Sequence, residues 1–283
     1  MGGSGEHDAK GSLSACHGKG ACQPESGTVS VWRGSSKTGN CMGVEKLQIP
    51  MFGLYGACST SGEALALASM SVAAGYGEYI LAVTSSHFGS AEKEFRFPLS
   101  YANQRPLSAH WTVTGSGAVL VGKKESHVRI SGLTVGKIVD YGLKDSQNMG
   151  ACMAPAACDT IWQNLQDFGR SPEDYSRIIT GDLGYVGQSI LFDLLLEKGY
   201  DIRGKHLDCG MTIFDQQTQD THAGGSGCGC AATVLSAYIL PKIERGEWER
   251  VLFVPTGALM STVSYNEGAS VPGIAHAIVL EHE

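Results

Sequence analysis

A cysteine at a predicted turn is the residue in this sequence best suited to covalent chemistry. Cys58 lies in the small-residue segment 56–61, after an apolar run and before a helical pattern at 64–70. A helix N-terminus offers free N–H groups and the positive end of the helix dipole, which favour a thiolate or bind an anion. The segment also suits a small apolar cysteine at a tight corner, with Thr60 and Glu63 forming a capping box. Both interpretations stay open.

The overall composition indicates a globular chain. It has 283 residues, of which 42% are hydrophobic and 17% charged, as expected for a protein with a substantial core. A net charge of −7 with only 21 lysines and arginines argues against nucleic acid as a partner. The sequence contains no run of about 18 apolar residues and no apolar N-terminal segment, so we expect neither a transmembrane helix nor a signal peptide.

The nine cysteines lack the spacing of small disulfide-rich secreted domains, which indicates reduced thiols. Cys228 and Cys230 are separated by one residue, and the sequence contains no C-x-x-C pair. No histidine spacing completes a zinc site either, so we expect no bound metal ion.

From residue 47 onward, the sequence repeats one pattern at an offset of 171 residues. In the first copy a helical segment is followed by an apolar strand at 80–84, and in the second copy the equivalent strand is 251–255. At this offset Cys58 aligns with Gly229, which lies between two cysteines. Each copy is therefore predicted to contain a small-residue corner, a helix and a buried strand.

The second copy contains further elements before its corner. Strands are predicted at 128–135 and 175–180, and helices at 156–168 and 187–198. Alternating strands and helices are typical of α/β halves. Apolar runs such as 81–83 in the first copy are expected to be covered on both faces.

The N-terminal segment differs from the rest of the chain. Residues 1–46 are rich in glycine, serine and lysine and lack apolar periodicity, so we expect them to be disordered, unable to pack as strand–helix units, and dispensable for ligand binding. The predicted division is an atypical segment at 1–46, a remnant of the first half at 47–127 and the second half at 128–283.

Seven motifs in order resemble the stage V sporulation protein AD family of endospore-forming bacteria, which is similar in fold to thiolases and ketoacyl synthases. The motifs are GLYGACSTS at 53–61, AVTSSH at 82–87, TVTGSGA at 112–118, TVGK at 134–137, MAPAA at 153–157, TGDL at 180–183 and AGGSGC at 223–228. The resemblance spans 47–283. It implies an α/β, thiolase-like fold of two related βαβαβ-type halves with pseudo-twofold symmetry, the first half being N-terminally incomplete.

The resemblance also implies a function that is not catalytic. Family members belong to the stage V sporulation A membrane complex, which moves dipicolinic acid (pyridine-2,6-dicarboxylic acid) into the developing spore. The member that this chain resembles is the soluble subunit, which binds dipicolinate in the groove that corresponds to the thiolase active site. The expected partners are dipicolinic acid and the other subunits of the complex, with a homodimer left open. The expected location is the developing spore, peripheral to the inner spore membrane. No cofactor is expected, and whether Ca²⁺ accompanies the ligand is left open.

The partners of a catalytic cysteine are missing from their usual places. Claisen-type acyl transfer needs His/His, His/Asn or His/Cys beside the nucleophile. The segment 181–184 contains no histidine, the corner 224–228 contains neither histidine nor asparagine, and 256–260 contains no cysteine. A binding protein is therefore favoured and no catalytic residue is assigned. The alternative is an acyltransferase that uses Cys58 as nucleophile, with His87 as a substitute base.

The predicted ligand site combines hydrogen-bond donors with glycines that allow a ligand to approach the backbone. Its members are Cys58, Ser59, His87, Asp182, Gly225, Ser226 and Thr256. The helix N-termini after Cys58 and after Cys228 are expected to converge and to bind carboxylates. Asp182 ends a strand. It would either cap the following helix or, beside an anionic ligand, need a proton or a bridging cation such as Ca²⁺.

Four further histidines are expected in the core, at the groove or at the surface. His276 lies in an apolar strand and is interpreted as a core residue, and His222 could face the groove. His110 and His206 are expected at the surface.

Overall fold

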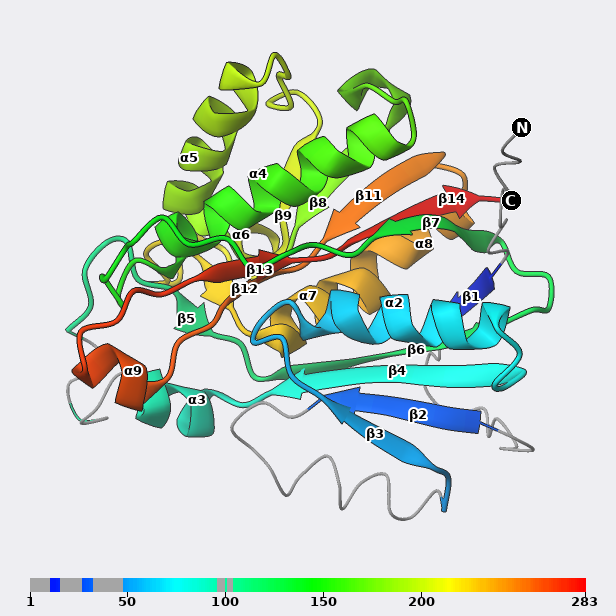
Figure 1. The fold of residues 1–283 in the computed structure, drawn as a ribbon, viewed down its shortest axis with the longest axis horizontal. Helices are drawn as coiled ribbons and strands as arrows, with labels where there is room; N and C mark the ends of the chain where they lie inside the picture. Colours follow the sequence, from blue (N-terminus) through cyan, green and yellow to red (C-terminus); the bar gives the residue numbers. More distant parts are fainter. Residues whose placement is uncertain (1–10, 16–26, 33–47, 96–99, 101–103) are drawn as a thin grey trace, which may run out of the picture.

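A computed structural model describes residues 11–15, 27–32, 48–95, 100 and 104–283. Their main feature is a ten-stranded sheet with the order β3-β2-β4-β6-β1-β7-β14-β11-β8-β9. Figure 1 shows this sheet folded into two layers, with α2, α7 and α8 between the layers and α4 and α5 on the outer face of the second layer. No helix among the described residues is long and apolar enough to cross a membrane.

The sheet consists of two runs of five strands. The first run is β1 (Gly11–Ala15), β2 (Gly27–Trp32), β3 (Met51–Leu54), β4 (Tyr79–Ser86) and β6 (Gly115–Gly122). The second run is β7 (Val128–Thr134), β8 (Arg177–Thr180), β9 (His206–Asp208), β11 (Arg250–Val254) and β14 (Ala277–His282).

Both runs have the same strand order and the same directions. Counted along the chain, each run is ordered third, second, fourth, fifth, first. In each run the second strand is parallel to the third and fourth, and the fifth is antiparallel to the fourth and first. The two runs join where β1 pairs with β7. This arrangement supports the predicted repeat of two related halves.

Helices and short strands connect these strands. The helices are α2 (Thr60–Ala73), α3 (Phe88–Phe95), α4 (Met149–Asp167), α5 (Gly184–Glu197), α6 (Cys209–Thr212), α7 (Cys228–Val234), α8 (Leu240–Glu244) and α9 (Thr262–Asn266). A 3-10 turn at Pro172–Asp174 precedes β8, and a π-helical turn at Leu235–Ile239 joins α7 to α8. The short strands are β5 (Trp111–Thr112), β10 (Gly225–Ser226), β12 (Thr256–Ala258) and β13 (Gly273–Ala275).

The strands of the second half are buried on both faces. Along β11, Val251 and Phe253 face the core between the two sheet layers, whereas Leu252 and Val254 face the core beneath α4 and α5. This alternation follows from the two-residue period of a strand. In β4, by contrast, Leu81 and Val83 are only half-buried, and the described helices with the most contacts to β4, α2 and α7, both lie in the middle layer. The expectation that 81–83 is covered on both faces is therefore corrected.

The N-terminal segment contributes two strands, which corrects our expectation for those stretches. We expected 1–46 to pack no regular element, yet 11–15 and 27–32 form β1 and β2. β2 is bonded on both sides, to β3 and to β4, and its Val29 and Val31 alternate with polar residues, a two-residue period that the expectation overlooked. The other residues of 1–46 lie outside the described residues.

The connection after the first strand is shorter in the first half than in the second. Residues 16–26 connect β1 to β2, whereas 135–176 connect β7 to β8 and include α4. The first connection is shorter than α4 alone, which has 19 residues. This supports the prediction that the first half lacks part of the pattern seen in the second.

The helix α4 begins earlier than predicted. We expected it at 156–168, where the sequence has an amphipathic pattern that begins just after Pro155. Instead α4 begins at Met149, capped by the side chain of Asn148, which accepts a hydrogen bond from Ala151 N at 3.3 Å. Pro155 lies inside the helix.

Candidate functional site

The corner before α2 is held by hydrogen bonds within its own turn. The Ser59 hydroxyl donates to Gly56 O at 2.6 Å, and the Thr60 hydroxyl donates to Ala57 O at 2.7 Å and accepts from Gly56 N at 2.9 Å. Ala57 adopts a φ of +52°, a strained value for a residue other than glycine. This turn fixes the position of Cys58. Ser59 is fully buried, and Thr60 does not form the predicted capping box, since no side chain caps the start of α2.

Asp182 lies opposite Cys58, just after β8, and is almost completely buried at 1% exposure. Its Oδ1 accepts a hydrogen bond from the Thr256 hydroxyl at 2.9 Å, and its Oδ2 accepts one from Gly227 N at 3.0 Å. The Cys58 thiol also donates to this carboxylate, and Asp182 N donates to Thr256 Oγ1 at 3.2 Å. The structure thus brings Cys58, Asp182 and Thr256 together.

Burial and charge make Cys58 a neutral thiol. Burial, followed by the negative charge of Asp182, raises the pKa of the Cys58 thiol well above its usual value. These effects exceed the lowering contribution of the nearby Gly227 N–H. Of the two interpretations left open for this corner, the raised pKa of the Cys58 thiol favours a neutral cysteine at a tight corner over a thiolate. Burial also raises the pKa of Asp182 to about 7.

The helix-capping role predicted for Asp182 belongs to a different carboxylate, Asp208. Asp208 is 2% exposed and accepts hydrogen bonds from Leu183 N at 2.9 Å and Gly184 N at 3.2 Å, at the start of α5. It also accepts from Met211 N at 3.2 Å, in α6. Because Asp208 binds the N-termini of two helices, the Asp182 carboxylate is left to face Cys58. Sequence reasoning missed Asp208, although its position just after an apolar residue and before Cys209-Gly210 is typical of a helix cap.

A buried chain of polar groups supports Asp208. The Thr180 hydroxyl donates to Asp208 Oδ2 at 2.6 Å and lies 2.9 Å from His206 Nε2. Since Thr180 has one proton to give, His206 Nε2 must be the donor in the second contact, and Nδ1 then accepts from Gln188 Nε2 at 2.9 Å. Burial lowers the pKa of His206 to about 3, so it is neutral. The expectation that His206 is a surface residue is wrong, because it is 8% exposed.

The second corner, before α7, closes against the end of β4. Gly227 has a φ of +105°, which favours glycine. The Cys228 thiol donates to Ser85 O at 3.0 Å, and Gly229 N donates to Ser86 Oγ at 3.1 Å. The Gly227 N–H lies at both Asp182 and Cys58, so the two predicted corners do converge. Cys58 and Gly227 are the half-buried members of this cluster, which links it to the surface.

The other predicted site residues lie around this centre in different roles. Gly225 and Ser226 form the buried strand β10, paired with β5. A Cβ at Gly225 would lie 2.9 Å from Ile213 and 3.0 Å from Phe214, so this glycine allows close packing of side chains. His87 lies at the exposed start of α3.

The other histidines have structural partners. His276 is buried, as expected of a core residue, and its Nδ1 accepts from Gly136 N at 3.3 Å. His222 Nε2 lies 3.0 Å from Asp220 Oδ1, on the loop before the glycine-rich corner. His110 is 2% exposed, which corrects the expectation that it lies at the surface.

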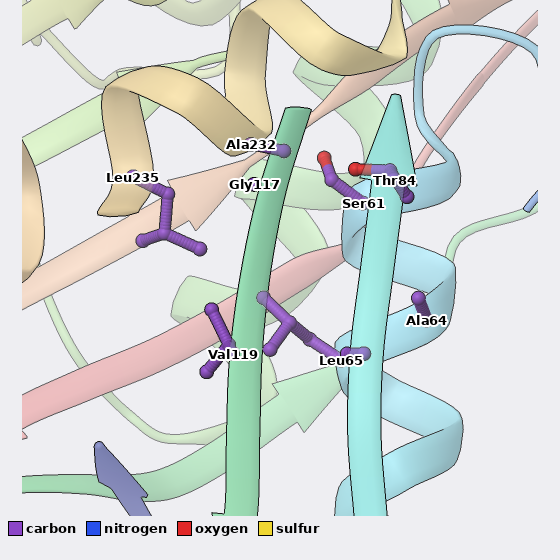
Figure 2. Close-up of a pocket in the computed structure, with 9 residues that line it drawn as sticks. Ser61, Ala64, Leu65, Thr84, Gly117, Val119, Ala232 and Leu235 are labelled. Carbon is purple, nitrogen blue, oxygen red and sulfur yellow. The ribbon is translucent and has the colours of Figure 1, made fainter. Parts of the chain in front are cut away.

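A small cavity lies beside this site, beneath α2. It is lined by Ser61, Ala64, Leu65, Ala82, Thr84, Gly117, Val119, Ala232 and Leu235. Ser61 and Thr84 lie side by side at its wall, with the Thr84 hydroxyl directed toward Ser61 (Figure 2). Its volume of about 10 Å³ suits a single water molecule and is too small for an organic ligand.

The described cysteines show no disulfide, and no metal cluster is present in the described part of the chain. Cys58, Cys152, Cys158, Cys209, Cys228 and Cys230 are all free thiols. In the same residues no group of three or more His, Cys, Asp or Glu side chains is arranged to hold a metal ion.

The fold is similar to that of solved thiolase-like enzymes. 3-Oxoacyl-(acyl-carrier-protein) synthase III from Aquifex aeolicus VF5 matches with a TM-score of 0.56 at 14% identity, over 92% of this chain and 79% of that one. Human mitochondrial 3-ketoacyl-CoA thiolase matches with a TM-score of 0.56 at 12% identity, over 94% of this chain and 88% of that one. These likenesses confirm the predicted thiolase-like α/β fold.

The sequence itself matches a sporulation protein. The chain is 45% identical over 235 residues to the Stage V sporulation protein AD of Bacillus subtilis (strain 168), a match that covers 83% of this chain and 69% of that protein. The family model of Stage V sporulation protein AD matches residues 36–281. With this match and the thiolase-like fold, the chain belongs to the Stage V sporulation protein AD (SpoVAD) family.

Proposed function

We propose that this chain binds dipicolinate at the Cys58–Asp182 site and does not transform it. The observation that carries the proposal is the pairing of Cys58 with a buried carboxyl group. A cysteine nucleophile needs a neighbour that lowers the pKa of its thiol, such as a histidine. Asp182 has the opposite effect, so the thiol acts as a neutral hydrogen-bond donor.

The donors around Asp182 are the type of groups that bind carboxylates. The Gly227 N–H, the Thr256 hydroxyl and the Cys58 thiol all point to one carboxyl group. This set already holds a carboxylate of the protein, which supports its ability to hold one from a ligand. Hydrogen bonds from neutral donors bind an anion without a lysine or arginine.

The wider role follows from the family. We propose that the chain acts with the other subunits of the stage V sporulation A membrane complex, at the inner membrane of the developing spore. In this role it would bind dipicolinic acid while the complex moves it, alone or together with Ca²⁺.

The alternative is an acyltransferase in which Cys58 becomes acylated. One observation favours it: Cys58 lies at a strand-to-helix corner of a fold whose solved examples include a ketoacyl synthase and a thiolase. Asp182, with a pKa of about 7, would then have to act as the base.

Two measurements separate these functions. Calorimetric titration with dipicolinate, with and without Ca²⁺, should show saturable binding if the first proposal is correct, and no heat of binding would contradict it. Incubation with an acyl-CoA followed by mass spectrometry should show no adduct. A stable adduct that disappears in Cys58→Ala but persists in the control Cys152→Ala would establish the acyltransferase instead.

A further inference from the structure

The donors of the candidate site are already used by a carboxyl group of the protein. Asp182 accepts hydrogen bonds from Thr256, Gly227 and Cys58. A ligand carboxylate that enters at the half-buried Cys58 and Gly227 would meet the same donors and, beside them, the Asp182 oxygens. Two carboxylates about 4 Å apart repel each other strongly in a buried site.

Among the described residues, the titratable groups that face Asp182 include no positively charged side chain that would offset this repulsion. The titratable groups that face it are Cys58 from the corner before α2, Cys228 and Cys230 from α7, Cys209 from α6 and Asp208 from β9. Four are thiols and the fifth is a second carboxyl group. His206 reaches Asp208 only through Thr180, and burial keeps it neutral. The ligand would therefore join a site whose facing groups are neutral or acidic.

We propose that Asp182 determines which charge state the site accepts, so that a dicarboxylate binds only when the Asp182 carboxyl group is protonated, and an ionised Asp182 takes up one proton as the ligand binds. This inference rests on the proposed function and specifies its chemistry. The proton comes from the solvent and forms an O–H bond on the Asp182 carboxyl group, and no other bond is made or broken. A protonated Asp182 becomes a hydrogen-bond donor and leaves the Gly227 N–H and the Cys58 thiol to the ligand.

Because Asp182 is buried, its carboxyl group gains or loses a proton near neutral pH. Burial raises the pKa of Asp182 to about 7, so below that pH the carboxyl group already carries its proton. Above it, the proton must be taken up as the ligand binds. The affinity should then be constant below about pH 7 and fall roughly tenfold for each pH unit above it.

The test uses calorimetry with pyridine-2,6-dicarboxylate as the probe, in the absence of divalent cations. Titrations at about pH 6 and about pH 8, each in two buffers of different ionisation enthalpy, measure the number of protons taken up per ligand. We expect close to one proton at the higher pH and a small fraction at the lower pH. For Asp182→Asn we expect no proton uptake and equal affinity at both pH values.

A matched control removes a different carboxyl group near the same corner. Glu63 lies on α2 and burial raises its pKa too. Glu63→Gln should keep the proton uptake of the unaltered protein.

The outcomes separate this inference from the proposed function. If the unaltered protein binds the probe at the higher pH without proton uptake, the inference is overturned, and this readout does not depend on any variant folding. It is equally overturned if a folded Asp182→Asn retains the original pH dependence. If the unaltered protein binds no probe even at the lower pH, the proposed function itself is wrong.

Discussion

At the scale of single residues, the behaviour of Cys58 depends on two opposing effects. The helix N-terminus lowers the pKa of a thiol, whereas burial beside a carboxyl group raises it. For Cys58 the second effect is larger. Its neighbour Asp182 is only 1% exposed and is fixed in place by hydrogen bonds from Thr256 and Gly227. The corner therefore has the geometry of a nucleophile site but the electrostatics of a hydrogen-bond donor.

Replacing Cys58 distinguishes the two roles. If the site binds dipicolinate, Cys58→Ala should change the affinity by less than about tenfold, or ~1.4 kcal/mol, since only one neutral donor is lost. Cys58→Asp should weaken binding far more, because it adds a carboxylate beside Asp182 and the ligand. Calorimetry measures both. Equal affinity of the unaltered protein and Cys58→Asp would place the ligand elsewhere.

Asp208 should be more important for stability than for ligand contact. It accepts hydrogen bonds from Thr180, Leu183, Gly184 and Met211, and an asparagine can accept with only one of its two side-chain heavy atoms. Asp208→Asn should therefore lower the free energy of unfolding by about 2–4 kcal/mol. Urea unfolding would measure this loss.

The matched control for Asp208 is Asp145, a carboxylate in an exposed turn. Asp145 accepts from Gln147 N at 2.9 Å. Asp145→Asn should leave the urea midpoint almost unchanged. A similar loss in both variants would mean that Asp208 does not hold the two helix N-termini as its contacts suggest.

Some residues of the candidate site could be predicted from the sequence, and others could not. Cys58, Asp182 and Thr256 could be identified because they follow the carboxyl ends of β3, β8 and β11, where α/β folds commonly place their sites. Asp208 was missed because its strand β9 has only three residues and little apolar pattern. The hydrogen-bond partner of the Ser59 hydroxyl could not be predicted from the sequence, because its bond to Gly56 O depends on the geometry of the turn.

At the scale of elements, a close backbone contact explains why the helix α4 begins earlier than the apolar periodicity of the sequence predicts. β13 passes directly over α4, and a Cβ at Gly273 would lie 2.6 Å from Cys152 O and 3.1 Å from Met153 Cα. The first turns of α4 lie on the N-terminal side of Pro155, and they are buried. Proline is an interruption signal in sequence, whereas packing against β13 is a tertiary effect, so the start of α4 could not be found from the pattern.

The contact between β13 and α4 makes a specific prediction. Gly273→Ala should lower the free energy of unfolding by about 1–3 kcal/mol, because two backbones must move apart. Gly204→Ala is the control, since nothing lies within 4 Å of a Cβ at that position. Urea unfolding of both variants measures the difference. Equal stability of the two would show that α4 can shift without cost.

At the scale of the whole molecule, the repeat was predictable and the joining of its halves was not. The offset of 171 residues relates β4 to β11, and in the structure each of these strands is the fourth along the chain in its run of five. The strand β1, which joins the runs, pairs with β6 and β7. Those partners lie about 100 residues away in sequence, and such pairing leaves no local pattern.

The whole molecule also contains two buried groups with opposite responses to pH. Burial lowers the pKa of His206 to about 3, so the unfolded chain binds more protons below about pH 6.5 and stability is lost as the pH falls from there. Burial raises the pKa of Asp182 to about 7, so the unfolded chain releases a proton that the folded protein keeps, and stability is lost as the pH rises from about 4 through 7. Each slope is at most ~1.4 kcal/mol per pH unit.

Between about pH 4 and pH 6.5 the two slopes oppose each other, and single replacements should separate them. Relative to the unaltered protein, His206→Gln should gain stability as the pH falls through this range, because it lacks a group that must gain a proton on unfolding. Asp182→Asn should instead gain relative stability as the pH rises, because it lacks a proton that unfolding releases. Urea unfolding at several pH values measures both differences. If neither difference varies with pH, His206 and Asp182 are not neutral and buried in the folded protein as their contacts indicate.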